Sequence, residues 1–469
     1  MEQRSKQLSR REFLKQAAVV AGASTLAACA PAPTPTATPV PKQAAATAAP
    51  PAPTAAPTKP KEKPKLVFWC GVTYTAEADA LVDKQAKDWC AQNNVDIEIN
   101  RMAADVRVPK WKTAFETKQF PDIGAYLEMN DAAKFMLAGV LLETTDLVNK
   151  LNKLEGGYVE GALRDSRRAD GRYFMVPAFA STEVFYVRKD KLAEKGLALP
   201  ETWEDVVNVA KKITEPGKFW GLGLQVGTPS WDSEVELSSM LWAYGAKTWD
   251  EQGKVAIDSA ETRTVLNLIR DAWKAGIIPP DATTWDDSGN NKAYLTGIAG
   301  MIWNTPSVLA NMEKNDPNLL SKTEITLLPK GPKGRFTSGY YYRWGIFNTT
   351  KFPEAALGLM EYLTQPAQLR PVYDLSAGNM MPVYKNMMND DMWKKSKQRE
   401  TVVKMVEFTV PQGYPGSTTP WIQDAWMDHT ICKMFNRVMV DGWDNDKAIA
   451  EAKTALQKWY DDWQARLKA

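Results

Sequence analysis

The sequence predicts an α/β protein with two folded lobes. Strand-like and helix-like segments alternate from residue 66 onward, which is typical of a largely parallel sheet covered by helices. The chain has 469 residues, and about 400 of them remain after a low-complexity leader, which is more than one hydrophobic core usually serves. No internal repeat of solenoid period is present. We therefore expect two α/β lobes.

The first 29 residues have the organisation of a secretory signal. Basic side chains up to Lys15 are followed by an Ala-rich stretch, residues 17–28, that is too short to span a bilayer. Residues 9–15, SRREFLK, resemble the twin-arginine export motif. Residues 26–29, LAAC, resemble a lipobox, in which a diacylglyceryl group joins the cysteine. We expect lipidation of Cys29; the alternative is an ordinary cleavage that leaves a stray cysteine.

Residues 30–65 differ from the rest of the chain in composition. They are nearly all Ala, Pro, Thr and Lys and contain no aromatic residue, so they cannot bury enough apolar surface to fold. A semi-extended spacer directly after a lipid anchor would hold a folded domain away from the headgroups. We expect a disordered tether and an extracytoplasmic protein, anchored by lipid to the outer face of the cytoplasmic membrane, on the cell surface or the periplasmic side.

The folded part begins with a strand, a helix and a second strand. Residues 65–70 form an apolar run, residues 77–91 place apolar side chains on one helical face, and residues 95–99 alternate strictly. This order is the βαβ signature of parallel pairing. Thr202 and Asp205 are spaced almost as in a capping box, which predicts the start of a later helix. Further helices are expected at 203–213, 261–275, 353–363, 422–440 and 446–467, and a further strand at 255–258.

Charge, histidine and cysteine content exclude several classes of function. The formal net charge of +2 gives no electrostatic case for a nucleic-acid partner. The only histidine is His429, which argues against His-based triads and multi-His zinc sites. No phosphate-binding loop appears, so we expect no cofactor and no metal. With Cys29 lipidated, a Cys70–Cys90 disulfide and three free buried thiols are the alternatives.

Several motifs occur in an order that resembles a known family. They are DGRYFMVP at 170–177, VFYVRKD at 184–190, PETWED at 200–205 after Gly196-Leu197, YLTGIAGM at 294–301 and KFPEAA at 351–356. Together they resemble extracellular solute-binding protein family 1, which includes the maltose-binding protein and supplies sugars to ABC importers. The resemblance covers nearly all of residues 66–463.

The resemblance implies a periplasmic-binding-protein-like fold, with two α/β lobes joined by a multi-strand hinge and a ligand cleft between them. Chain crossings are expected near residues 178–183, 296–301 and 343–348. The implied lobes are residues 66–180 plus 300–345 (amino lobe) and residues 181–299 plus 346–469 (carboxyl lobe). The implied function is a monomeric binding protein, not an enzyme, that captures a mono- or oligosaccharide and delivers it to the transmembrane subunits of an ABC permease.

Sugar recognition requires aromatic faces for the ring C–H groups and polar side chains for the hydroxyls. The chain has 18 Trp and 15 Tyr, many of them in loops, although each one alone could equally be packing. The family pattern nominates these ligand-binding residues: Tyr74, Tyr126, Glu128, Asn130, Asp131, Ser181, Glu183, Trp231, Trp303, Asn304, Gly339, Tyr340, Tyr341, Arg343, Trp421 and Trp426. Few basic residues lie in these loops, which disfavours phosphorylated ligands.

Two choices stay open at this point. The aromatic run 338–344 is either a core strand or a wall of the ligand site, and Arg343 favours the wall because a buried arginine needs an acceptor. A glycosidase with paired carboxylates and a surface lipoprotein without transport function are alternatives to the binding protein. Release of free sugar would indicate the first, and an absence of ligand-dependent closure the second.

Overall fold

The computed structural model describes residues 62–468, apart from residues 74, 126, 128–131, 165, 169, 229 and 377. The signal, Cys29 and nearly all of the predicted tether therefore lie outside the described residues. The chain divides into Met1–Pro60 and a compact unit, Lys61–Ala469. None of its described helices is both long and apolar enough to cross a bilayer.

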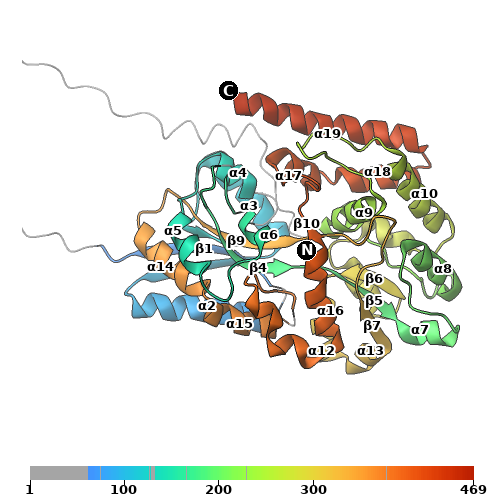
Figure 1. Cartoon of the computed structure of the whole chain (residues 1–469), viewed down its shortest axis with the longest axis horizontal. Coiled ribbons are helices and arrows are strands. Elements are labelled where there is room, and N and C mark those ends of the chain that lie inside the picture. Colours follow the sequence, from blue (N-terminus) through green and yellow to red (C-terminus); the bar gives the residue numbers. More distant parts are fainter. Residues whose placement is uncertain are drawn as a thin grey trace, which may run out of the picture. The chain divides into compact units, whose positions relative to one another are not determined.

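The first lobe is built on a five-stranded mixed sheet with the order β2-β1-β3-β9-β4 (Figure 1). β1 (Lys65–Gly71) pairs in parallel with β2 (Asp96–Met102) and β3 (Ile123–Gly124), as the βαβ pattern predicts. β9 (Tyr340–Ile346) lies antiparallel to β3 and to β4 (Val176–Ser181). A strand from late in the sequence thus completes the amino-lobe sheet.

Helices α14 and α15 pack on α2, although they are far from it in the sequence (Figure 1). In α2, Ala78, Val82 and Ala86 are buried at a spacing of four, which places one apolar stripe against the lobe's core. The helices of this lobe are α2 (Ala76–Gln92), α3 (Ala104–Thr117), α4 (Ala132–Leu137), α5 (Thr145–Leu151), α6 (Glu160–Arg164), α14 (Pro353–Leu363) and α15 (Pro366–Leu375), followed by the 3-10 helices η2 (Asn386–Asn389) and η3 (Asp391–Lys395).

The second lobe contains a three-stranded antiparallel sheet with the order β6-β5-β7. β5 (Val184–Arg188) lies between β6 (Met301–Asn304) and β7 (Thr323–Thr326). All five side chains of β5 are buried, because helices and loops cover both faces of this small sheet. Two short strands, β8 (Thr337–Ser338) and β10 (Thr409–Val410), pair separately.

The long helix α19 packs on α17 and α18 at one side of this lobe (Figure 1). The predicted helix 422–440 is two helices, because His429 adopts a left-handed φ of 52° between them. The strand predicted at 255–258 is limited to an isolated bridge at Val255. The helices are α7 (Lys189–Glu194), α8 (Trp203–Ile213), α9 (Trp231–Tyr244), α10 (Ala260–Lys274), η1 (Pro280–Thr284), α11 (Gly289–Leu295), α12 (Ser307–Asn315), α13 (Pro317–Lys322), α16 (Lys397–Met405), η4 (Val406–Phe408), α17 (Pro420–Met427), α18 (Thr430–Met439) and α19 (Asn445–Lys468).

The observed strand pairing assigns segments of the chain to the two lobes differently from the predicted boundaries. The chain crosses between β4 and β5, within the predicted span 178–183, and again between β8 and β9 at Gly339. The predicted crossing at 296–301 instead leads from α11 into β6 of the same lobe. β6 and β7 therefore belong to the carboxyl lobe, whereas α14 and α15 belong to the amino lobe. A further crossing follows η3, because α16 packs on β5 and β7.

The three cysteines of the folded unit are free thiols. Cys70, Cys90 and Cys432 are all buried and none is paired, so the structure favours the thiol alternative over a Cys70–Cys90 disulfide. Burial raises the pKa of the Cys70 thiol to about 12 and that of Cys90 to about 11. These thiols therefore stay protonated and unreactive at neutral pH.

The capping box of α8 provides a test of the local structure. The Thr202 hydroxyl accepts from the Asp205 amide at 3.1 Å, and the Asp205 carboxylate accepts from the Thr202 amide at 3.0 Å. We expect Thr202→Ala to lower the free energy of unfolding by about 1 kcal/mol. The matched control is Thr264→Ala, an exposed threonine inside α10, which should change stability by less than about 0.5 kcal/mol. Urea denaturation measures both, and equal effects would contradict the role of the cap.

Candidate functional site

A pocket with a volume of about 370 Å³ lies between the two lobes. Three groups of residues line it, two from the amino lobe and one from the start of α17 in the carboxyl lobe. The lining residues are Ala132, Ala133 and Met136 of α4; Arg164, Arg167, Arg168 and Arg343; and Ser417, Thr418 and Gln423. Because both lobes contribute, a ligand held here would contact both at once.

Arg343 reaches this pocket from the middle of β9. It is only 6% exposed, and its Nε donates to the carbonyl of Leu127 at 3.4 Å while its own carbonyl accepts from the Leu127 amide at 2.8 Å. Opposite Arg343, the register of β4 shifts between Pro177 and Phe179. Proline cannot donate to the ladder, and such irregularities re-aim side chains beside functional sites.

The other three arginines lie at the end of α6 and in the turn that follows it. The Arg168 amide donates to the Arg172 carbonyl and the Gly171 amide to the Arg168 carbonyl, both at 2.9 Å, and Gly171 has the left-handed φ of 85° that closes this turn. The Arg168 guanidinium lies 5.3 Å from the centre of the Phe174 ring. Arg167 pairs with Glu160 at 3.1 Å on the surface. The turn thus gathers positive charge at one side of the pocket.

The carboxyl-lobe side of the pocket is the N-terminus of α17. Thr419 is its N-cap residue, and its side chain does not accept from the first amides of the helix, where the positive end of the helix dipole lies. Gln423, one turn further on, is 1% exposed, and its Oε1 has no hydrogen-bond partner among the described residues. Beside it, Asp424 pairs with Lys134 of α4 at 2.5 Å, an ion pair that joins the two lobes at the pocket.

Two of the predicted site residues, Glu183 and Asn304, meet in a buried polar cluster of the carboxyl lobe. The Asn304 amide nitrogen donates to Asp232 at 3.2 Å and to Asn290 at 2.9 Å. The Asn290 amide nitrogen in turn donates to Glu236 at 3.1 Å. Burial raises the pKa values of these three carboxyl groups, that of Glu183 to about 8 and those of Asp232 and Glu236 well above their ordinary values. Burial thus disfavours the charged form of each of these carboxyl groups.

Several predicted tryptophans are buried in the carboxyl lobe. Trp303 is 2% exposed and stacks on Trp203 with ring centres 5.4 Å apart. The Trp421 indole nitrogen donates to the Gly253 carbonyl at 2.8 Å. The ring centres of Trp231 and Trp426 lie 5.5 Å apart, and the side chain of Trp426 is buried. None of these four lines the pocket between the lobes.

Of the remaining predicted residues, four are described by the structure and five are not. Ser181 is buried at the end of β4, and Tyr341 is buried in β9. Gly339 lies at the crossing into β9, where a Cβ would stand 2.7 Å from the Cβ of Thr409. Tyr340 begins β9. Tyr74, Tyr126, Glu128, Asn130 and Asp131 lie outside the described residues.

Of the predicted site residues that the structure describes, only Arg343 lines the pocket between the lobes. Arg164, Arg167 and Arg168 were not predicted from the sequence. The sequence also led us to expect few basic residues in the loops of the site, whereas four arginines line this pocket. A local signal was present, because three arginines occur within the five residues RDSRR at 164–168, directly before the motif at 170–177. No local sequence signal marks Ser417, Thr418 and Gln423 as site residues. They reach the pocket only because the tertiary structure places the start of α17 beside α4 and β9.

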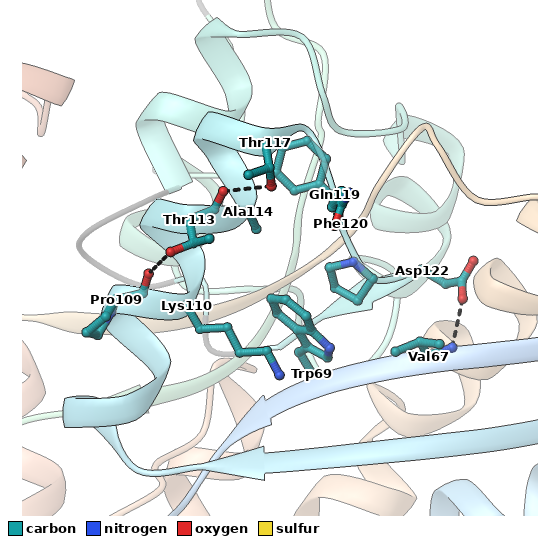
Figure 2. Close-up of a pocket in the computed structure, with 11 residues that line it drawn as sticks. Val67, Trp69, Pro109, Lys110, Thr113, Ala114, Thr117, Gln119, Phe120 and Asp122 are labelled. Carbon is teal, nitrogen blue, oxygen red and sulfur yellow. Dashed lines mark hydrogen bonds between the residues drawn. The ribbon is translucent and has the colours of Figure 1, made fainter. Parts of the chain in front are cut away.

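A second hollow, of about 490 Å³, lies within the amino lobe between α3 and β1 (Figure 2). Its main polar groups are already engaged by the protein. Asp122 accepts from the Val67 amide at 2.7 Å and from the Thr350 hydroxyl at 2.5 Å. The Lys110 ammonium lies 4.0 Å from the centre of the Trp69 ring. Since only one lobe lines this hollow, the pocket between the lobes is the candidate site.

The described residues contain no group of three or more His, Cys, Asp or Glu side chains arranged to hold a metal ion. The pocket between the lobes offers guanidinium and amide donors and apolar contacts, which suit binding of a polar organic molecule. Two α/β lobes with such a pocket between them define a bilobal binding protein.

Comparison with known proteins gives the family. Residues 72–369 match the model of the bacterial extracellular solute-binding protein family, and the chain belongs to this family. It is a family of binding proteins and not of enzymes. The Escherichia coli K12 protein YcjN is 26% identical over 269 residues, which are 56% of this chain and 61% of YcjN, so the match spans less than two thirds of that relative.

Solved structures share the fold. The maltose-bound MalE3 of Thermotoga maritima has a TM-score of 0.73 and 22% identity, and covers 84% of this chain and 99% of its own. A solute-binding protein of Thermotoga lettingae bound with α-D-tagatose has a TM-score of 0.74 and 18% identity, with coverage of 84% and 99%. These likenesses confirm the predicted periplasmic-binding-protein fold of two α/β lobes.

The buried carboxyl cluster predicts a pH dependence of stability. Glutamate in an unfolded chain titrates at about 4.3, and in the folded protein burial raises the pKa of Glu183 to about 8. The contribution of Glu183 to stability is therefore intact below about pH 4.3, declines as the pH rises to about 8, and is constant above that. We expect Glu183→Gln to gain stability relative to the parent protein by on the order of 1 kcal/mol per pH unit between pH 5 and 8.

Urea denaturation at four pH values between 5 and 8 measures this difference. The control is Glu116→Gln, which removes an exposed glutamate of α3 and should give no such trend. Parallel stability curves for Glu183→Gln and the parent protein would show that Glu183 is ionised in the folded state.

Proposed function

We propose that the protein is the receptor of an ABC importer and that it captures a carbohydrate between its two lobes. The observation that carries the proposal is the pocket between the lobes, lined from both sides in a protein of the solute-binding family. A ligand that contacts both lobes stabilises the form in which they are closed. That form would then be recognised by the permease, and transport would draw its energy from the permease's ATPase.

The nature of the ligand is inferred from two directions. The two similar structures hold a disaccharide, maltose, and a monosaccharide, α-D-tagatose. The pocket volume of about 370 Å³ lies within the range of sites for small molecules. Hydroxyls of a sugar can donate to the Gln423 Oε1 and accept from the arginine N–H groups. These points support a mono- or short oligosaccharide.

Closure of the lobes would act on the ion pairs that join them. Lys134 and Asp424 lie beside the pocket, and Lys314 of α12 pairs with Glu77 of α2 at 2.5 Å on the surface. The second pair is exposed, so it contributes little to stability. The first is largely shielded from water and sits next to the residues that line the pocket, so we expect it to favour the closed arrangement.

We further propose that the protein is exported by the twin-arginine route and anchored through lipid on Cys29. The basic start, the SRREFLK and LAAC motifs and the Ala/Pro/Thr-rich segment support this arrangement. Two acyl chains on one glycerol give stable attachment. The anchor would keep the receptor close to its permease, and the tether would let the lobes reach it.

Ligand binding and closure can be measured together. We expect one or more members of a panel of mono- and oligosaccharides to raise the melting temperature of the protein without being degraded, because binding to the folded state alone stabilises it. Small-angle scattering with the same sugar should report a smaller radius of gyration. Appearance of hydrolysis products would indicate an enzyme, and an unchanged melting temperature with every sugar would contradict a carbohydrate ligand.

The anchor is tested by replacing the cysteine. In a bacterial expression host we expect the parent protein in the membrane fraction and Cys29→Ser in the soluble extracytoplasmic fraction, because the variant cannot accept the diacylglyceryl group. Cys90→Ser, which changes a buried cysteine of the folded unit, is the control and should remain with the membrane. Retention of Cys29→Ser at the membrane would contradict the lipid anchor.

A further inference from the structure

We propose that Trp463 of α19 is a positioning residue for ligand capture. It acts through Asp424, which it orients to pair with Lys134 of the amino lobe when the two lobes close. These three side chains are called the latch below. The inference rests on the proposed function. It adds the C-terminal helix α19, none of whose residues lines the pocket, to the elements that set the affinity for a sugar.

The two carboxylate oxygens of Asp424 have different partners. Oδ1 lies 2.5 Å from the Lys134 ammonium, and Oδ2 accepts from the Trp463 indole nitrogen at 2.7 Å. Lys134 belongs to α4 in the amino lobe, whereas Asp424 and Trp463 belong to α17 and α19 in the carboxyl lobe, and the three helices lie on the same side of the molecule (Figure 1). Because its own lobe fixes one oxygen, the other oxygen is directed at the amino lobe.

The latch is shielded from water. The side chains of Lys134 and Asp424 are 20% and 12% exposed, and Trp463 is buried. A charge that is withdrawn from water needs a partner more than an exposed charge does. The surface pair that also joins the lobes, Lys314 with Glu77, is 63% and 52% exposed, so water competes with it. Of these two pairs, the latch therefore has the larger effect on the arrangement of the lobes.

α19 contacts α17 at a second place. The rings of Tyr460 and Trp421 meet edge to face with their centres 5.6 Å apart, and Tyr460 lies three residues before Trp463, on the same side of α19. α17 has only eight residues, and so short a helix takes its orientation from packing. Asp424 is next to Gln423, which lines the pocket. The contacts of α19 therefore orient both the carboxylate of the latch and a pocket residue.

The latch lies at the edge of the pocket, because Ala133 and Met136 line the pocket from either side of Lys134 in the sequence. Opening of the lobes would separate Lys134 from Asp424 and return both charges to water. Closure without Lys134 would withdraw the Asp424 carboxylate from water with no cation beside it, which is unfavourable. Loss of Lys134 therefore disfavours the closed arrangement, and a lower affinity for a sugar follows.

Titration calorimetry on the full-length protein tests the latch by a double-mutant cycle. The probes are maltose, α-D-tagatose and the sugar that most raises the melting temperature. We expect Lys134→Met to weaken binding by about fivefold, and Trp463→Phe, which keeps an aromatic ring but loses the indole N–H, by about threefold. In the Lys134→Met background, Trp463→Phe should have no further effect, because the carboxylate that it orients no longer faces a cation.

A conservative variant and two controls complete the cycle. Lys134→Arg keeps a cation and should retain most of the affinity. Lys314→Met removes the lysine of the exposed pair between the lobes. Trp459→Phe removes an indole N–H of α19 from a side chain other than the one that bonds to Asp424. Both controls should bind the sugar as the parent protein does.

The outcomes separate the latch from the function on which it rests. An equal loss from Trp463→Phe with and without Lys134 would overturn the proposal, since Trp463 would then act on the pocket by another route. Unchanged affinity in Lys134→Met would also overturn it. Absence of binding by every sugar would contradict the carbohydrate function. Small-angle scattering of the ligand-free proteins then tests the latch alone: Lys134→Met should have a larger radius of gyration than Lys314→Met, and equal radii would overturn the proposal.

Discussion

The passage of the chain between its two sheets at Thr182 and Glu183 is the constraint on which the rest of the structure depends. β4 ends at Ser181 in the amino-lobe sheet, and β5 begins at Val184 in the carboxyl-lobe sheet. Only these two residues separate the strands, and both are buried. So short a connection holds the edges of the two sheets close together, and the second passage at Gly339 lies between strands of the same two lobes. A pocket between the lobes is a consequence of this topology.

The carboxyl lobe and the pocket between the lobes differ in the charged groups that they contain. In the carboxyl lobe, Glu183, Asp232 and Glu236 are buried together, and burial raises their pKa values because it disfavours the charged form. In the pocket, arginines gather without an acidic side chain among the described lining residues. Arginine cannot shed its proton, so its charge must be met by another group. Burial therefore has a different consequence for the two clusters, because a carboxyl group can lose its charge whereas an arginine keeps it.

The local elements of the fold could be predicted from the sequence. The strand, helix and strand at the start of the folded unit, the capping box at Thr202 and the helix at Pro353 follow from periodicity and end signals, which act over a few residues. The break at His429 could not be predicted, because a left-handed residue inside an apolar periodic stretch leaves no local trace. The lobe boundaries also differ, since strand pairing between distant segments, such as β9 with β4, decides them.

The candidate site was less predictable than the fold. Family pattern and aromatic content pointed to Trp303 and Trp421, but these side chains are used for packing within the carboxyl lobe. Arg343 was nominated by the family pattern and by the argument that a buried arginine needs an acceptor. Its companions Arg164, Arg167 and Arg168 come from a turn after a short helix, and Gln423 comes from a helix near the end of the chain. Their meeting is a property of the tertiary structure.

The central claim is that a carbohydrate is held in the pocket between the lobes. A crystal structure of the protein grown with the sugar that most raises its melting temperature tests this claim most directly. We expect electron density for the sugar in this pocket, with a sugar hydroxyl within hydrogen-bonding distance of Gln423. Density for the sugar in the hollow between α3 and β1 instead would contradict the claim.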